Sequence, residues 1–290
     1  MWVAQGLGSA AFESCYSAAS HSIGHRWSTF MIAWWQRIAA ALFISAFALC
    51  WRGALPHAPV TARFWIPAAL SIALNTGTSL LYVRALRHDL SLTIPITALS
   101  PVFLLASEPL MTGRAVPLLG MCGVGVIAIG LYVLNLPVLR THGLLGPFKN
   151  VWREAGPRMM LIVVVIWAVT APLDKLAVAA YDPLWYSVTL HGGIAILLTP
   201  LLWRQSARDN TSIRGAWRLG ALGILSGSGS MLQMTALLSA PATYVIALRR
   251  FSAPLSALWG WLFFKEPHIA ARLLGTFIMT AGAVILLLSL

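Results

Sequence analysis

Long apolar stretches alternate with short polar breaks along the whole chain. A helix needs about 20 mostly apolar residues to cross the hydrocarbon core of a bilayer, and stretches of roughly that length occur ten times. We therefore predict an all-α integral membrane protein with ten transmembrane helices, over residues 2–19, 28–50, 64–86, 91–111, 115–136, 158–178, 183–203, 216–238, 241–264 and 270–290. Most connections are short, and even the two long ones, 137–158 and 204–215, leave no room for a soluble catalytic domain.

The connection at 137–158 divides the chain into two halves of five predicted helices, and both halves carry the same signals. These are a proline midway along a helix, a charged turn and two glycines seven residues apart: Pro101, Gly113-Arg114 and Gly123/Gly130 in the first half, Pro254, Lys265-Glu266 and Gly275/Gly282 in the second. Because five is an odd number, the second copy must cross the membrane in the inverted direction, which is typical of secondary transporters. We expect a first repeat over 1–137, a connector over 138–157 and a second repeat over 158–290.

Composition supports the membrane assignment and excludes other classes. Charged residues make up only 10% of the chain and hydrophobic residues 59%, whereas about a quarter of the residues in a soluble domain are charged. The net charge of +12 could indicate nucleic-acid binding, but the basic residues are scattered among apolar segments, so we expect no nucleic-acid partner. Cys15, Cys50 and Cys122 each lie in an apolar segment without the spacing of metal ligands, so we expect no metal site.

Sequence signatures of enzymes and of ATP-driven pumps are missing. The chain contains no HExxH, no GxSxG and no Walker A motif. We therefore expect that the protein is not an enzyme and needs no cofactor, and that an ion gradient or solute exchange drives it. A multispan membrane enzyme is the remote alternative.

The pattern resembles the drug/metabolite transporter superfamily in its EamA-like branch. The resemblance rests on ten helices in two five-helix repeats, and on apolar segments punctuated by proline, glycine and glutamate, such as SAPLSALWGWLFFKEP over 252–267. It implies a secondary active transporter that moves a small organic solute by alternating access, as a multi-pass protein of the bacterial inner membrane. EamA-like repeats often carry Gly-Glu after the fourth helix, whereas the first half here has Gly113-Arg114 and only the second half retains the glutamate, as Glu266.

Arg249 and Arg250 lie deep in the ninth predicted helix, where a charged side chain costs about 2.5–3.5 kcal/mol on insertion scales. Neighbouring residues on a helix point about 100° apart, so one arginine can face a central cavity while the other reaches an adjacent helix. A guanidinium group is a planar fork suited to phosphate or carboxylate. The pair also resembles the Lys-Arg pair that binds substrate phosphate in the ninth helix of the plastid sugar-phosphate translocators. We predict an anion site; the alternative is an internal ion pair with Glu13 or Glu108.

Alignment of the two halves places the arginine pair opposite the segment LTIPITALSP of the fourth helix, which offers the hydroxyl groups of Thr93, Thr97 and Ser100. An arginine pair that faces hydroxyl groups can bind one anion, with its charge held by the second half and its polar body by the first. The predicted substrate-binding residues are Arg249, Arg250, Tyr244, Tyr82, Asn75, Thr97, Gln233 and Trp167. Interhelical hydrogen bonds are the alternative role for the amide and hydroxyl side chains.

Further charged residues lie within the predicted helices. Glu13, midway along the first helix, resembles in position the glutamate that small multidrug transporters use to exchange protons for substrate, so it is the proton-coupling candidate. The alternative for Glu13 is a permanent pair with one of the intramembrane arginines. A structural or gating role is expected for Arg37, for Glu108 in a helix-end salt bridge, and for Asp174 and Lys175 as an end-of-helix pair.

These signals predict a secondary active transporter for a small organic solute that is anionic or bears phosphate. The alternative is an exporter of amino acids or drugs in which the arginines form structural ion pairs. The expected partners are the small-molecule substrate and membrane lipid, and a homodimer is left open.

Overall fold

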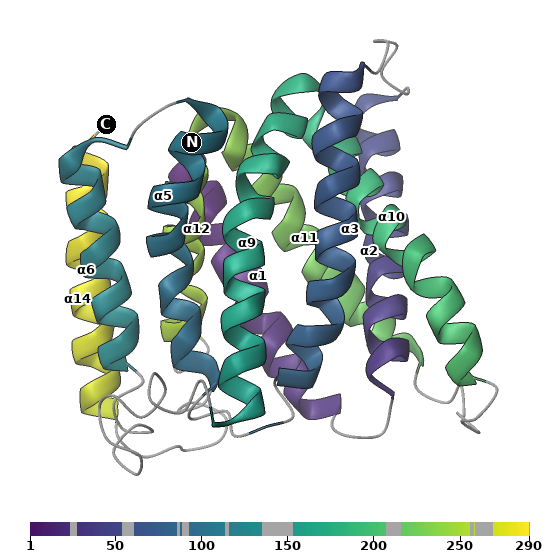
Figure 1. The fold of residues 1–290 in the computed structure, drawn as a ribbon, viewed down its shortest axis with the longest axis horizontal. Coiled ribbons are helices and arrows are strands. Elements are labelled where there is room, and N and C mark those ends of the chain that lie inside the picture. The colour runs from purple at the N-terminus through teal and green to yellow at the C-terminus, as the bar shows by residue number, and fades with distance from the viewer. Residues whose placement is uncertain are drawn as a thin grey trace. The chain divides into compact units, whose positions relative to one another are not determined.

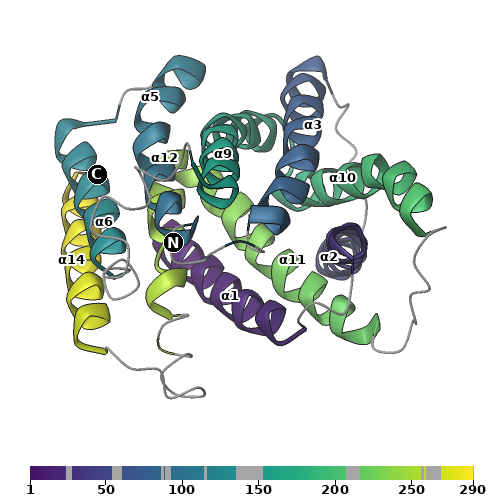
Figure 2. The ribbon, with the colours of Figure 1, turned by 60° about the horizontal axis from the view of Figure 1, so that its bottom comes forward.

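The computed structural model describes residues 1–23, 28–53, 61–85, 88, 93–113, 116–134, 153–206, 216–255, 258 and 269–289. These described residues form ten α-helices and a 3-10 helix, with no strand among them (Figures 1 and 2). The predicted all-α class is therefore confirmed. Most of both long connections, together with Arg114, Lys265 and Glu266, lies outside the described residues.

The helices follow the ten predicted spans closely. Their bounds are α1 Trp2–Ile23, α2 Thr29–Arg52, α3 Ala62–Ala85, η2 (the 3-10 helix) Ile94–Leu99, α5 Ser100–Thr112, α6 Leu118–Leu134, α9 Ala155–Ala180, α10 Pro183–Ser206, α11 Ala216–Ser239, α12 Ala242–Arg249 and α14 Ile269–Leu288. Two spans differ from the prediction. The fourth begins as η2 before α5, and the ninth is interrupted, because α12 ends at Arg249 and the chain turns at residues 250–251 before helix resumes at 252–255.

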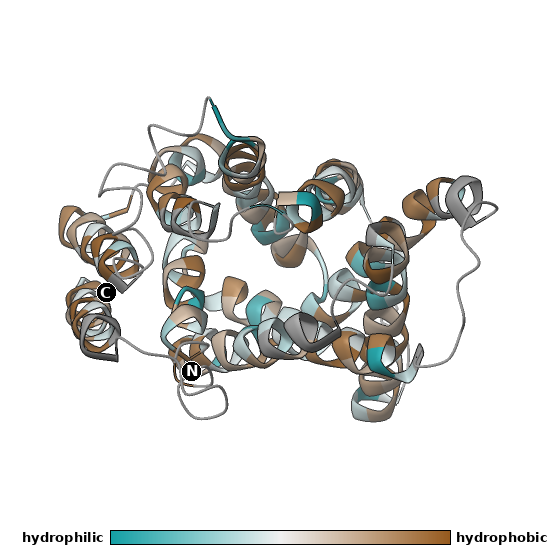
Figure 3. Cartoon of the chain, turned by 90° about the horizontal axis from the view of Figure 1, so that it is seen from below, coloured by the Kyte–Doolittle hydropathy of each residue, from teal (hydrophilic) through white to brown (hydrophobic). Residues whose placement is uncertain are grey.

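Length and hydropathy indicate which of the described helices could span a membrane. Among the described residues, five helical segments are long and apolar enough to cross a membrane: Phe30–Arg52, Ala62–Ala85, Ala155–Ala180, Pro183–Leu201 and Trp217–Ser239. Figure 3 shows hydrophobic residues over much of the helical ribbon and hydrophilic residues at scattered positions. Helices suit this setting because lipid offers no partners to backbone groups, which a helix satisfies internally.

Proline explains both departures from the predicted spans. Pro101 has no N–H to donate to the carbonyl of Thr97, and the backbone N–H and the hydroxyl of Ser100 bond to that carbonyl instead. Pro254 likewise leaves the carbonyl of Arg250 without its usual donor, and the N–H one residue before the proline binds it at 3.1 Å. In both halves, therefore, the carbonyl four residues before a proline accepts from a donor other than the usual one.

Contacts divide the described helices into two compact units, and each unit takes helices from both halves of the sequence. The first unit comprises Met1–Leu80 and Leu173–Ser239. In it, α11 packs against α1, α2 and α10, and α2 also packs against α10. Helices α2 and α11 approach closely at Gly223, where a Cβ would lie 2.4 Å from the Cβ of Ala39. A side chain at this position would push the two helices apart.

The second unit comprises Leu81–Pro172 and Ala240–Leu290. In it, helices α6 and α14 lie side by side (Figures 1 and 2). Gly123 and Gly282 face each other across this contact, since a Cβ on Gly123 would lie 2.9 Å from the carbonyl oxygen of Gly282. The paired glycines thus let the two backbones touch, as small residues do in many membrane helix pairs.

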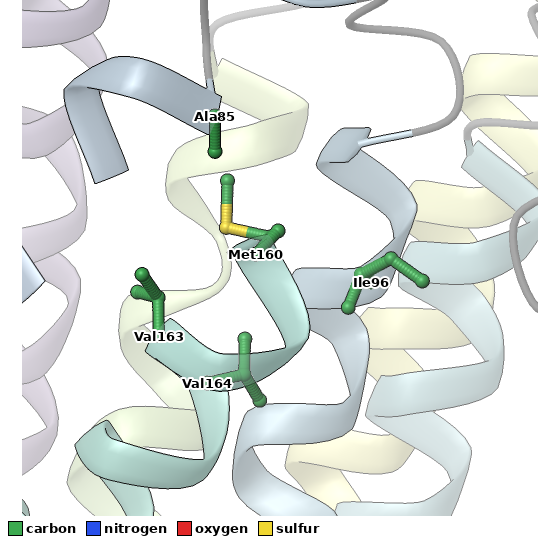
Figure 4. Packing of buried hydrophobic residues seen from close by; sticks show 5 residues of the cluster. All are labelled: Ala85, Ile96, Met160, Val163 and Val164. Atoms are coloured by element: carbon green, nitrogen blue, oxygen red, sulfur yellow. The ribbon is translucent and has the colours of Figure 1, made fainter. Parts of the chain in front are cut away.

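A hydrophobic cluster in the second unit brings together the end of α3, the helix η2 and the first part of α9. Its buried members are Ala85, Ile96, Met160, Val163 and Val164 (Figure 4). The partly buried side chains of Tyr82 and Trp167 pack against it. The cluster therefore holds in place two aromatic residues that the sequence predicts at the substrate.

Candidate functional site

Helix α5 contacts both ends of the short helix α12. At one end, the carboxylate of Glu108 accepts hydrogen bonds from the N–H groups of Ala242 and Thr243, each at 2.7 Å, and from Thr243 Oγ1 at 2.7 Å. At the other end, Ser100 Oγ accepts a hydrogen bond from Arg250 Nε at 2.9 Å. The two helices are therefore antiparallel, and their register is set at both ends.

Glu108 is buried, with 2% of its surface exposed. The first N–H groups of a helix have no partner within the helix and form the positive end of its dipole, so a carboxylate there is stabilising. The sequence predicts a helix-end salt bridge for Glu108, which stays a prediction; the structure shows its carboxylate as the acceptor for the start of α12. No local signal could show this contact, because acceptor and donors are 134 and 135 residues apart.

The guanidinium of Arg250 contacts a hydroxyl and an aromatic ring. Its central carbon is 5.5 Å from the ring centroid of Trp167, within the range of a cation–π contact. Trp167 packs against Tyr82, with ring centroids 5.4 Å apart. Ser100 donates its own hydroxyl hydrogen to the carbonyl of Thr97 at 2.9 Å, so it is the acceptor toward Arg250. The structure thus brings together four of the predicted substrate residues, one of them through its backbone.

The other predicted substrate residues have different surroundings. Tyr244 is buried, and its hydroxyl lies 2.7 Å from Ser289 Oγ, near the end of α14. Arg249 is half-buried at the last residue of α12. Asn75 and Gln233 belong to the first unit, where Asn75 is half-buried on α3 and Gln233 is buried on α11. Their roles in substrate binding stay predictions.

In the first unit, Arg37 of α2 reaches two other helices. Its Nη1 atom is 3.1 Å from Nδ1 of His191 on α10, and its Nη2 donates to Ser79 Oγ on α3 at 3.1 Å. These hydrogen bonds connect three helices through one side chain. A structural or gating role, which the sequence predicts for Arg37, stays a prediction.

Asp174 of α9 is buried, and its Oδ1 atom accepts hydrogen bonds from Ser71 Oγ and Tyr186 OH at 2.5 Å each. Asn75 Nδ2 donates to the same Ser71 hydroxyl at 3.0 Å. The sequence predicts a pair with the neighbouring Lys175, which is half-buried, at the end of a helix. Helix α9 continues beyond both residues, and hydroxyl groups of α3 and α10 bind the carboxylate. Sequence reasoning missed this hydroxyl environment because it comes from two other helices.

Glu13 is half-buried on α1, and the hydroxyl of Ser17 donates to its backbone carbonyl at 2.9 Å. Its role as a proton carrier stays a prediction. Within the described part of the chain, no three His, Cys, Asp or Glu side chains are grouped so that they could hold a metal ion.

The ten α-helices of the described residues, with apolar spans that carry a few charged side chains, and the match of both halves to one family model define an integral membrane protein of the transporter type. The chain belongs to the EamA-like transporter family, whose model matches residues 1–136 and 155–288. The two matched segments correspond to the two halves of the sequence. The family lies within the drug/metabolite transporter superfamily, so the protein is a membrane transporter of small solutes.

A solved crystal structure is similar over nearly the whole chain. The TM-score is 0.79 at 15% sequence identity, and the alignment covers 99% of this chain and 97% of that one. At 15% identity, this similarity establishes a shared fold but not a shared function. No curated protein matches the sequence.

Proposed function

We propose that the protein carries a small anionic organic solute, with a carboxylate or phosphate group, across the membrane by alternating access. Membership of the family supports a transporter of small solutes, and the setting of Arg250 supports an anionic solute. The observation that carries the proposal is the hydrogen bond from Arg250 Nε to Ser100 Oγ, with the ring of Trp167 beside the same guanidinium.

These two contacts orient the guanidinium of Arg250 without cancelling its charge, because a hydroxyl and an indole ring are both neutral. A guanidinium has five N–H donors in one plane, and Ser100 accepts from the donor at Nε. The two terminal nitrogens form the fork that binds a carboxylate or phosphate through parallel hydrogen bonds. We therefore expect the guanidinium of Arg250 to contact the anionic group of the solute.

The position of Glu108 supports the anion site over an exporter in which Glu108 neutralises the arginines. Its carboxylate binds the N–H groups of residues 242 and 243. At 1.5 Å per residue, these two N–H groups are about 10–12 Å along the helix axis from Arg250. Glu108 thus offsets the dipole of α12 at the end opposite Arg250.

The proposal also assigns a coupling proton, further solute contacts and a membrane. Glu13 is the candidate for a coupling proton, by its resemblance to the glutamate of small multidrug transporters. Arg249, Tyr244, Asn75 and Gln233 are candidates for contact with the rest of the solute. The membrane that we propose is the bacterial inner membrane.

The test is ligand-dependent thermal stability of the purified protein in detergent, with panels of phosphate esters, carboxylates, amino acids and organic cations. A phosphate ester or carboxylate should raise the unfolding temperature of the wild type, and Arg250→Gln should remove this effect. The matched control is Arg218→Gln, because Arg218 also lies 5.5 Å from a tryptophan ring, that of Trp217, but is exposed. Stabilisation by organic cations or neutral compounds alone would contradict the proposal.

A further inference from the structure

The carboxyl group of Asp174 lies inside the first unit, and the residue has 5% of its surface exposed. Its Oδ1 atom accepts hydrogen bonds from the hydroxyls of Ser71 on α3 and Tyr186 on α10, both at 2.5 Å. Both donors belong to residues with no exposed surface. Three helices therefore meet at one carboxylate oxygen.

Backbone N–H groups donate to Glu108, whereas hydroxyl groups donate to Asp174 Oδ1. Glu108 accepts from the hydroxyl of Thr243 and from two backbone N–H groups, which can only donate, so the N–H groups need an acceptor oxygen on each side of the carboxylate. A hydroxyl group can rotate, and it can donate or accept. Ser71 and Tyr186 can therefore satisfy Asp174 both as a carboxylate and as a carboxylic acid.

We propose that Asp174 is a reversible proton-binding site of this transporter. The carboxylate takes a proton from water to become a carboxylic acid, and the acid returns the same proton to water when it ionises. Ionisable residues inside membranes often serve as proton relays. On α2, α3, α9 and α10 within the first unit, the described charged or titratable side chains besides Asp174 are Lys175 of α9, Tyr186 and His191 of α10, Arg63 of α3, and Arg37, Cys50 and Arg52 of α2, of which Arg52 pairs with Asp182.

A chain of hydrogen bonds links Asp174 to a predicted substrate residue. Asn75 Nδ2 donates to Ser71 Oγ at 3.0 Å, and Ser79 Oγ donates to the backbone carbonyl of Asn75 at 2.7 Å. Arg37 Nη2 in turn donates to Ser79 Oγ at 3.1 Å. A serine hydroxyl oxygen has two lone pairs, so Ser71 can accept from Asn75 and from a protonated Asp174 at the same time.

The experiment is pH-difference infrared spectroscopy of the full chain reconstituted in lipid. It needs no substrate, so its outcome is independent of the Arg250 test. Acidification should produce the C=O stretching band of a protonated carboxylic acid that Asp174→Asn removes, while Glu108→Gln and Glu13→Gln leave it in place. If Asp174→Asn removes no C=O band, or if the band is removed by Glu13→Gln alone, the proposal is wrong.

Two further variants leave Asp174 in place, so they test the proposal even if Asp174→Asn does not fold. Tyr186→Phe and Ser71→Ala each remove one hydrogen bond to the carboxyl oxygen, so the C=O band should move to higher wavenumber. Ser187→Ala is the matched control, because Ser187 is buried beside Tyr186 on α10 and bonds to the carbonyl of Pro183. A band at the wild-type position in both Tyr186→Phe and Ser71→Ala would overturn the assignment.

Discussion

Ser100 and Arg250 form a hydrogen bond at the point where proline interrupts a helix in each half of the chain. Pro101 leaves the carbonyl of Thr97 without its usual backbone donor, and the hydroxyl of Ser100 donates to that carbonyl at 2.9 Å. The oxygen of the same hydroxyl accepts from Arg250 Nε at 2.9 Å. The helix break therefore fixes the direction of the hydroxyl that orients the guanidinium.

Ser100→Ala should weaken anion binding while the protein still folds. The change removes the acceptor for Arg250 Nε, and a hydrogen bond to a charged group contributes about 1.5–3 kcal/mol. The affinity for the best carboxylate or phosphate ester should therefore fall about tenfold or more, as measured by isothermal titration calorimetry. The control is Ser228→Ala, because Ser228 of α11 bonds to the carbonyl of Ile224 in its own helix. Equal losses in the two variants would show that Ser100 does not act through Arg250.

Glu108→Gln should loosen the start of α12. A glutamine keeps one acceptor oxygen but turns an NH₂ group toward a backbone N–H, which leaves a buried donor unsatisfied at a cost of about 1–3 kcal/mol. Hydrogen–deuterium exchange of residues 242–249 should become faster, and the affinity of Arg250 for anions should fall with it. Glu154→Gln, at an exposed acid before α9, should change stability by less than about 0.5 kcal/mol. Unchanged exchange in α12 would argue against Glu108 as its anchor.

Gly282→Ala should destabilise the contact between α6 and α14. Its Cβ would lie 2.7 Å from the backbone nitrogen of Ile127 and 2.8 Å from the carbonyl oxygen of Gly123, so one helix must move. Overpacking of this kind costs about 1–3 kcal/mol, which thermal unfolding followed by circular dichroism can measure. Gly125→Ala on α6 is the control, because a Cβ there meets no atom within 4 Å and alanine favours helix by up to about 1 kcal/mol. A loss of stability in Gly125→Ala alone would contradict the packing described here.

The helix bounds could be predicted because the length and hydropathy of a span are local properties of the sequence. The sequence predicts helices over 183–203 and 216–238, and the structure has Pro183–Ser206 and Ala216–Ser239. The interruption after Arg249 could not be placed in the same way. Pro254 is visible in the sequence, but whether a helix continues through a proline depends on partners that neighbouring helices supply.

The candidate site could be predicted in part. Alignment of the halves places the hydroxyls of the fourth helix opposite the arginine pair, and the structure has Ser100 against Arg250. The partners of Glu108 and Asp174 could not be predicted, because they depend on how distant helices pack. A carboxylate in an apolar segment shows that it needs a partner, but not whether this is a cation, a hydroxyl group or the start of a helix.

The contact between Arg37 and His191 has a consequence for the protonation of the imidazole ring. A guanidinium offers no lone pair, so the Nδ1 atom of His191, 3.1 Å from Arg37 Nη1, must be the acceptor. The ring is therefore the neutral tautomer with its hydrogen on Nε2. A proton on Nδ1 would set two donors against each other, so this link between α2 and α10 depends on the position of a single hydrogen atom.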